Sequence, residues 1–436
     1  MVAYIAIIIL LIALMIGIPI PFVFLLTVIY LIFSLGYDPS FLIPYGFSQL
    51  NNMVLLAIPL FIMAGTVMST GGIGERIVDF TQVIVGKTRG GMGVVTVIAC
   101  AIFGAMSGSA AAALTSIGSI MFPRLVDNGY SKGFASSLIT SSSVLGLLIP
   151  PSAIMILYAW VGNQSVLASF LATVVPALIL MFFFSIINFF YMRKKEVVMF
   201  SIPKLSDEPA PSRAQEFKSK GISAIPGLLM PVIVLGGIYG GFMTPTEAAA
   251  ISVVYAIPVG LWVYKEMDRK GLYKALVDAA TTTGVIMVML YAIMILSRII
   301  IMENVPDALT NILLSITDNM LLLMLLVNLF LIIIGMLMDD VSAILLATPL
   351  LLPLVVNLGV DPIHFAAIIG VNLGLGLLTP PTAPLLYLGS RMSKTPINQM
   401  LGPTMVMIFL AWIPTLIITT FVPEVALFLP RLLLGY

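Results

Sequence analysis

The sequence predicts an all-α polytopic membrane protein built from two inverted repeats, and three observations lead to this prediction. The chain has 436 residues, of which 60% are hydrophobic and 9% charged, whereas soluble domains carry about 25% charged residues. Its apolar segments have the length of membrane helices, about 20 residues, and lack the short alternating pattern of an outer-membrane barrel. Finally, the phrase LGLLIPPSAI at Leu145–Ile154 returns almost unchanged as LGLLTPPTAP at Leu375–Pro384.

Charge and cysteine content exclude several function classes. The net charge of +1 gives no bias toward nucleic acid. Cys100 is the single cysteine, which excludes an internal disulfide and a cysteine-based metal site. We therefore expect the lipid bilayer as a partner, and neither nucleic acid nor a cofactor.

The apolar segments lie on either side of one polar stretch. Residues 193–223 contain seven basic and four acidic residues and predict a flexible cytoplasmic linker, because cytoplasmic loops are rich in Lys and Arg. The linker separates a first repeat, 1–192, from a second, 224–436. The predicted membrane segments are 3–17, 21–35, 52–68, 92–122, 134–160, 166–192, 224–242, 247–264, 275–302, 322–352, 364–390 and 402–421.

Placing Pro380 on Pro150 superimposes the second half on the first without a gap across the matched stretch. The pairs that then coincide are Pro123 with Pro353, Gly129 with Gly359, Gly146 with Gly376, Pro150 with Pro380 and Pro151 with Pro381. Two stretches that share this register predict one structural unit used twice.

The positions of basic residues predict that the two units are inverted. Basic loops can be kept cytoplasmic only if segments 92–122 and 322–352 each enter and leave the membrane on one side. Each segment is too long for one ordinary crossing and too short for two. We expect two re-entrant hairpins that open to opposite sides, together with about ten crossings.

The repeated phrase predicts two broken helices, 134–160 and 364–390. Pro150 and Pro151 have no N–H to donate, so the carbonyls one turn earlier, around Gly146, lose their helical partners. Such carbonyls are costly in hydrocarbon unless they line a polar cavity. A hard cation such as sodium can take them as oxygen ligands, as Mg²⁺ and Ca²⁺ do.

Each predicted hairpin has a tip that can approach a break. Ser107, Gly108 and Ser109 form a turn of small residues with hydroxyls and open backbone in the first hairpin. In the second hairpin Asp339 aligns with Ser109. The break that matches it contains three residues with backbone or hydroxyl oxygens: Gly376, Thr379 and Thr382.

Ionisable and polar residues inside membrane segments are functional candidates. Arg298 either extends to the interface or offers a forked donor to a carboxylate. Asp339 and Asp340 are adjacent, so one can help to hold a cation while the other is solvated. Asn372 precedes the second break by one turn and either orients it or only packs there.

These residues resemble the large membrane subunit of tripartite ATP-independent periplasmic (TRAP) transporters. The resemblance rests on GGIYGGFMTPTEAAAIS at Gly236–Ser252, AIPLFIMAG at Ala57–Gly65, GAMSGSAAA at Gly104–Ala112 and the paired PP breaks. It covers essentially the whole chain. One departure is the first tip, where many members carry a proline after the second serine.

The resemblance implies sodium-driven uptake of an organic acid by an elevator movement of a transport domain against a scaffold, in the bacterial inner membrane. It implies two partners: a periplasmic substrate-binding protein and a small four-helix membrane subunit, here a separate chain. A first sodium site would use Gly104, Ser107, Gly146, Ile149 and Pro151, and a second Gly335, Gly376, Thr379 and Thr382. Ser109, Arg298 and Asp340 match polar positions needed for transport.

Three alternatives to this function stay open from the sequence. A carrier that needs no binding protein would share the inverted repeats, and a channel could use broken helices as a filter. An intramembrane enzyme is disfavoured, because the chain has neither a His pair nor catalytic Asp residues in separate helices. Sialic acid, C4-dicarboxylates and keto acids all fit a small-residue cavity with one Arg, and we favour sialic acid weakly.

Overall fold

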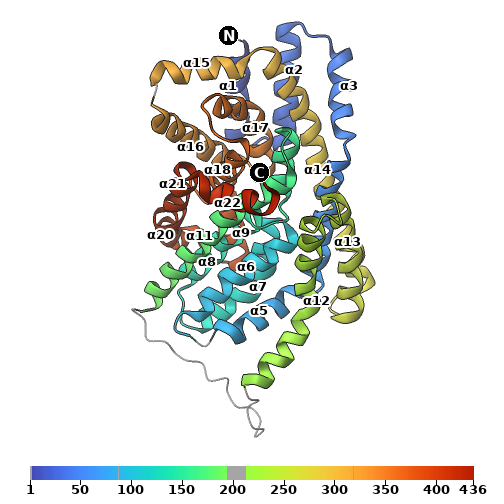
Figure 1. The fold of residues 1–436 in the computed structure, drawn as a ribbon, viewed down its shortest axis with the longest axis vertical. Coiled ribbons are helices and arrows are strands. Elements are labelled where there is room, and N and C mark those ends of the chain that lie inside the picture. Colours follow the sequence, from blue (N-terminus) through green and yellow to red (C-terminus); the bar gives the residue numbers. More distant parts are fainter. Residues whose placement is uncertain (1, 87, 194–212, 318) are drawn as a thin grey trace.

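The computed structural model describes residues 2–86, 88–193, 213–317 and 319–436, and all regular secondary structure in them is helical (Figure 1). The first half contains α1 (Val2–Met15), α2 (Ile20–Leu35), α3 (Pro39–Leu50), a short 3-10 turn (Met53–Leu56), α4 (Ala57–Thr70), α5 (Ile73–Val85), α6 (Gly91–Ser107), α7 (Ala110–Asp127), α8 (Lys132–Ser143), α9 (Leu145–Leu148), α10 (Ala153–Val161) and α11 (Val166–Arg193).

The second half repeats this order with small changes. It contains α12 (Arg213–Tyr239), α13 (Pro245–Pro258), a π-helical turn (Val259–Val263), α14 (Arg269–Met302), α15 (Val305–Ile316), α16 (Met320–Leu337), α17 (Asp340–Asn357), α18 (Pro362–Gly376), α19 (Pro384–Ser393), α20 (Ile397–Met407), a second π-helical turn (Ile408–Trp412), α21 (Ile413–Phe421) and α22 (Pro423–Leu434).

The register that places Pro380 on Pro150 holds for whole helices. In this register both bounds of α17 coincide with those of α7, and α6, α10 and α11 pair closely with α16, α19 and the run from α20 to α21. Helices α5 and α15 also pair, and they lie near opposite ends of the molecule (Figure 1). The orientation of the two halves in a membrane stays a prediction.

Helix length and apolarity confirm the membrane class. Eight helices of the described chain are long and apolar enough to cross a membrane, and α8–α9 with α10 form a pair bent by 43° that has the length and apolarity of a broken span or a re-entrant loop. Each of the two predicted hairpin segments is a pair of helices, with breaks at Gly108 and at Met338–Asp339. The number of crossings, about ten, stays a prediction.

Several helices were not predicted from apolarity. Helix α5 contains Glu75, Arg76 and Asp79, so it is not a continuous apolar segment, yet its apolar face is buried. Helices α3, α15 and α22 have only 12 residues each. Helix α12 begins at Arg213, inside the predicted linker, and Phe217 packs on Phe80 with ring centroids 5.6 Å apart. The rest of the linker, 194–212, lies outside the described residues.

The helices that carry the repeated phrase form the centre of the protein. All the side chains of α18 after Pro362 are buried, and so are nearly all those of α8 and most of α6. Outer helices instead expose large apolar side chains, such as Phe33 on α2 and Trp262 after α13. A membrane protein can expose such side chains because lipid covers them. The candidate sites therefore lie in the packed interior.

Candidate functional site

The first hairpin reverses direction on one glycine. Helix α6 ends at Ser107, and Gly108 adopts a left-handed conformation with φ 60° while its N–H donates to the Gly104 carbonyl at 2.8 Å. Glycine takes this conformation without steric cost. Ser109 is the N-cap of α7, and its hydroxyl accepts from the Ala112 N–H at 3.4 Å. The break between the two helices therefore falls at Gly108 and Ser109, within the predicted tip.

The backbone of the first hairpin tip is in direct contact with the backbone of the first break. A Cβ atom on Gly104 would collide with the Cα of Gly146 and lie 2.8 Å from its nitrogen. A Cβ on Gly108 would lie 2.8 Å from the Pro151 carbonyl oxygen, and one on Gly146 would lie 3.0 Å from that of Ser109. The contact therefore requires glycine, and it gathers carbonyl oxygens in one place.

Hydroxyls replace the missing N–H groups at this break. Gly146 and Leu147 receive no hydrogen bond from the residue four positions on, because Pro150 and Pro151 have no N–H. The Ser152 hydroxyl donates to the Leu147 carbonyl at 2.5 Å, and the Thr173 hydroxyl of α11 donates to that of Leu148. Ile149, between Leu148 and the proline pair, is extended. Each carbonyl oxygen keeps a second lone pair for a ligand.

The second hairpin and the second break meet in the same way. A Cβ on Gly376 would lie 2.5 Å from the carbonyl carbon of Gly335, and one on Gly335 would lie 3.2 Å from the Cα of Leu373. The Thr382 hydroxyl donates across this contact to the Met336 carbonyl. The Thr379 hydroxyl donates to the Leu375 carbonyl of its own helix at 2.7 Å. A donating hydroxyl still offers lone pairs.

The predicted sodium-site residues belong to the hairpins and breaks that meet at these two contacts. The contacts themselves include Gly104, Gly146 and Pro151 at the first and Gly335, Gly376 and Thr382 at the second, and sodium binding there stays a prediction. Their oxygens are neutral backbone and hydroxyl groups. Within the described chain no group of three or more His, Cys, Asp or Glu side chains occurs that could hold a metal ion. Neutral oxygens of this kind suit a hard cation of low charge better than Zn²⁺ or a transition metal.

Contacts between the halves join the two breaks into one packed unit. Ser136 and Ser137 of α8 hydrogen-bond to Thr395 at 3.2 Å and to the Met400 carbonyl at 2.9 Å. On α19, a Cβ at Gly389 would collide with the Thr140 hydroxyl, so the two helices touch directly. The helix that follows the second break is therefore fixed to the helix that precedes the first.

Of the predicted transport residues, the two aspartates lie at the second hairpin tip, whereas Arg298 lies on α14. Asp339 is the N-cap of α17, in the register of Ser109, and its Oδ1 is buried without a hydrogen-bond partner among the described residues. Asp340 begins α17 and is half-buried. Arg298 is exposed on α14, with its guanidinium 5.5 Å from the centroid of the Tyr45 ring, so the structure pairs it with α3 rather than with a tip.

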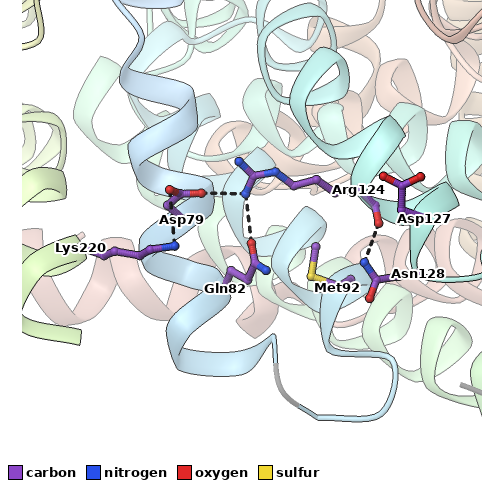
Figure 2. A pocket seen from close by; sticks show the side chains of 7 residues that line it. All are labelled: Asp79, Gln82, Met92, Arg124, Asp127, Asn128 and Lys220. Carbon is purple, nitrogen blue, oxygen red and sulfur yellow. Dashed lines mark hydrogen bonds and ion pairs between the residues drawn. The ribbon is translucent and has the colours of Figure 1, made fainter. Parts of the chain in front are cut away.

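A charged cluster ties the far end of the first hairpin to its surroundings. Arg124 of α7 lies between Asp79 and Gln82 of α5, and Lys220 of α12 reaches the same carboxylate (Figure 2). The Arg124 guanidinium is 2.7 Å from Asp79 and 3.0 Å from the Gln82 side-chain oxygen, and the Lys220 Nζ is 3.6 Å from Asp79. These residues line an open cavity of about 430 Å³. Opposite charges alternate there, which indicates a structural junction of three helices.

Three contributors at the first tip and break were not predicted. Ser152 directly follows the proline pair, and Thr173 lies on the next helix, where sequence spacing carries no signal for the contact. Gly65 of α4 is a third: a Cβ there would lie 3.0 Å from the Ser107 Cβ. It ends the motif AIPLFIMAG, so the motif offered a signal that it packs against the tip.

Paired helical hairpins that meet broken helices define a class of polytopic membrane transporter folds. Solved transporter structures share the architecture: the Alcanivorax borkumensis YdaH transporter has a TM-score of 0.59, 13% identity and coverage of 87% of each chain. Neisseria gonorrhoeae MtrF has a TM-score of 0.58, 13% identity and coverage of 87% of this chain and 84% of its own. At this identity the likeness shows the fold alone.

The particular family follows from sequence. Residues 7–425 match the family described as the DctM component of the tripartite ATP-independent periplasmic transporter, and the chain belongs to this family of large membrane permeases. It is 35% identical to the sialic acid TRAP transporter large permease SiaM of Vibrio cholerae, over 89% of this chain and 88% of that one. It is 34% identical to the C4-dicarboxylate permease DctM of Pseudomonas aeruginosa, with 88% coverage of each.

Another relative is longer than this chain. The isethionate TRAP transporter permease DctMQ of Oleidesulfovibrio alaskensis is 33% identical over 95% of this chain, which spans 64% of that relative. The three relatives named here carry three different substrates in their names. Membership of the family is thus settled by these matches, whereas the substrate differs from one relative to the next.

Proposed function

We propose that the chain is the large membrane subunit of a sodium-coupled transporter that takes up an organic acid delivered by a periplasmic substrate-binding protein. The observation that carries the proposal is the pair of tip–break contacts, at Gly104 with Gly146 and at Gly335 with Gly376. Each gathers neutral oxygens beside a proline-broken helix, in a chain of a transporter family. Sodium can be held by such oxygens, and two separate places allow two ions.

The packing supports an elevator movement. The two breaks belong to one unit through the contacts of α8 with α19 and α20, so they can only move together. In the proposal this unit carries substrate and sodium across the membrane past the outer helices, which form the scaffold. The partner would be a small four-helix membrane subunit, and the location the bacterial inner membrane.

The experiment is uptake into proteoliposomes that contain this chain and its small subunit, with the cognate binding protein outside. An inward sodium gradient should drive uptake without ATP. A potassium or proton gradient that drives uptake equally well would refute the sodium coupling. Omission of the binding protein separates this proposal from the alternative of an independent carrier, because that carrier would retain uptake; a channel would conduct without saturation by substrate.

The substrate class rests on the cognate binding protein. Sialic acid, C4-dicarboxylates and keto acids are all carboxylates of suitable size, and we propose sialic acid as the first of them to test. A thermal-shift screen of organic acids on that binding protein is the direct test. The acid that raises its melting temperature most at equal concentration should also be the one transported.

A further inference from the structure

Three buried polar side chains link the second hairpin to two neighbouring helices. The Asn372 amide of α18 donates to the Asn328 side-chain oxygen of α16 at 2.7 Å, and the Asn328 amide donates to the Thr420 hydroxyl of α21 at 3.0 Å. The exposed fractions of Asn372, Asn328 and Thr420 are 0%, 4% and 5%. Asn328 is the single polar side chain in α16, whose sequence is MLLLMLLVNLFLIIIGML.

This hydrogen-bonded pair lies directly beside the second tip–break contact. Gly376 follows Asn372 by one helical turn, about 6 Å along α18, and Gly335 follows Asn328 by two turns, about 10 Å along α16. Both helices therefore run the same way from the amides to the glycines. Any slide of α16 along α18 would move the Gly335 and Met336 carbonyls relative to Gly376 and Thr382.

Apolar packing alone does not prevent α16 from sliding along α18. Leu and Ile side chains in α16 give similar contacts in neighbouring registers, whereas the hydrogen bond from the Asn372 amide to the Asn328 oxygen forms in only one register. The Asn372 Oδ1 is buried without a hydrogen-bond partner among the described residues. A single buried Asn sets register in coiled coils in this way, and hydrogen bonds between membrane helices contribute about 0.6 kcal/mol on average. The pair therefore selects one alignment of the two helices.

We propose that Asn328, through Asn372, is a positioning residue for the second cation site. The inference rests on the proposed sodium coupling and adds to it which side chains hold the site in register. Neither amide needs to touch the ion. The first repeat has no such pair, because the aligned positions are Ile98 and Ser142, so the device belongs to the second site alone.

A second buried asparagine provides a matched control. Asn188 of α11 is 0% exposed; its amide donates to the Gly90 carbonyl at 2.7 Å and its oxygen accepts from the Tyr130 hydroxyl at 2.9 Å. It joins helices by the same chemistry but at the start of the first hairpin, remote in sequence from the second break. Asn188→Leu should lower stability without altering the second site.

The test is the sodium dependence of the melting temperature of the purified full chain, with choline chloride holding ionic strength constant. Sodium that binds the folded state raises this temperature. Asn328→Leu and Asn372→Leu should each raise the sodium concentration at half-maximal shift about three- to tenfold and lower the Hill coefficient toward one. The double variant should raise this sodium concentration no further than the larger single variant does, because either single substitution already removes the hydrogen bond between the two amides.

Each outcome decides the proposal. Asn188→Leu should melt at a lower temperature with an unchanged sodium midpoint; an equal rise in its midpoint would mean that general loosening explains the effect. If the leucine variants do not fold, Asn372→Ser decides, since it removes the amide that donates to Asn328 and introduces the residue found at the aligned position of the first repeat, Ser142: a raised midpoint supports the inference and an unchanged one overturns it. A wild-type protein that does not respond to sodium would refute the proposed coupling itself, whatever the variants do.

Discussion

Gly376→Ala should abolish the second site by steric displacement, and the structure gives the size of that displacement. A Cβ at this position would lie 2.5 Å from the carbonyl carbon and 2.7 Å from the Cα of Gly335, and 2.9 Å from the Met336 nitrogen. All three atoms are backbone, so no side chain can rotate away. To move from 2.5 Å to ordinary contact at 3.4 Å, the helices must separate by about 0.9 Å.

A separation of this size exceeds what cation coordination tolerates. Oxygen ligands of Ca²⁺ lie within 2.3–2.6 Å, a window of about 0.3 Å, and we expect a similar window for sodium. We therefore expect at least a tenfold loss of apparent sodium affinity in uptake. Overpacking of this kind also costs about 1–3 kcal/mol of stability, which a thermal melt in the absence of sodium measures separately.

Two other glycines make the prediction quantitative. Gly335→Ala modifies the same contact from the opposite helix, but its Cβ would lie 3.2 Å from the nearest atom, so a shift of about 0.2 Å suffices and sodium affinity should change less than about threefold. Gly284→Ala has open space around it and should leave transport unchanged while it favours the helix by about 1 kcal/mol. Equal damage from Gly376→Ala and Gly335→Ala, or wild-type sodium dependence in both, would refute the steric reasoning.

Three further predictions concern the hydroxyl ligands, the topology and the charged cluster. Thr379→Ala should weaken sodium activation of uptake and lower its Hill coefficient toward one, because one hydroxyl of the second site is lost; unchanged activation would mean that this break is only a kink. Single cysteines at Ser131 and Asp361 should react with an impermeant thiol reagent from the cytoplasm and from outside respectively, and labelling from one side would disprove the inversion. Asp79→Asn should lower the melting temperature slightly, since partly exposed ion pairs contribute about 0–1 kcal/mol, and a variant that melts at the same temperature as the unmodified protein would mean that the pair contributes nothing.

The register of the repeat could be predicted from sequence because it depends on prolines and glycines, whose effects on the backbone are the same in any surroundings. Proline removes an N–H wherever it stands, and glycine at a tip permits a left-handed turn. For this reason the sequence indicated a turn at Gly108 and breaks after Gly146 and Gly376, and helices of the structure end at or close to these positions. Apolar length then supplied the helices between them.

Contacts between distant helices could not be predicted in this way. The Thr173 hydroxyl reaches the Leu148 carbonyl from the next helix, and one threonine among many in an apolar helix gives no sign of it. Arg298 is the opposite case: its charge marked it as a candidate for the substrate site, but the structure places it over Tyr45. A charge in a membrane segment indicates function only when its partners are known, and partners depend on tertiary structure.

Contacts between distant helices also make the two breaks differ, although the two breaks have nearly the same local sequence. At the first break the Ser152 hydroxyl binds the freed Leu147 carbonyl, and the Thr173 hydroxyl of α11 binds the neighbouring Leu148 carbonyl. At the second, Thr382 donates instead to the Met336 carbonyl of the hairpin. The first break is thus tied to a long neighbouring helix, and the second to its own hairpin tip. Opening of the second hairpin would break a hydrogen bond at its site, whereas no such hydroxyl bond joins the first tip to its break within the described chain. A variant at one break therefore does not predict the effect of the matching variant at the other.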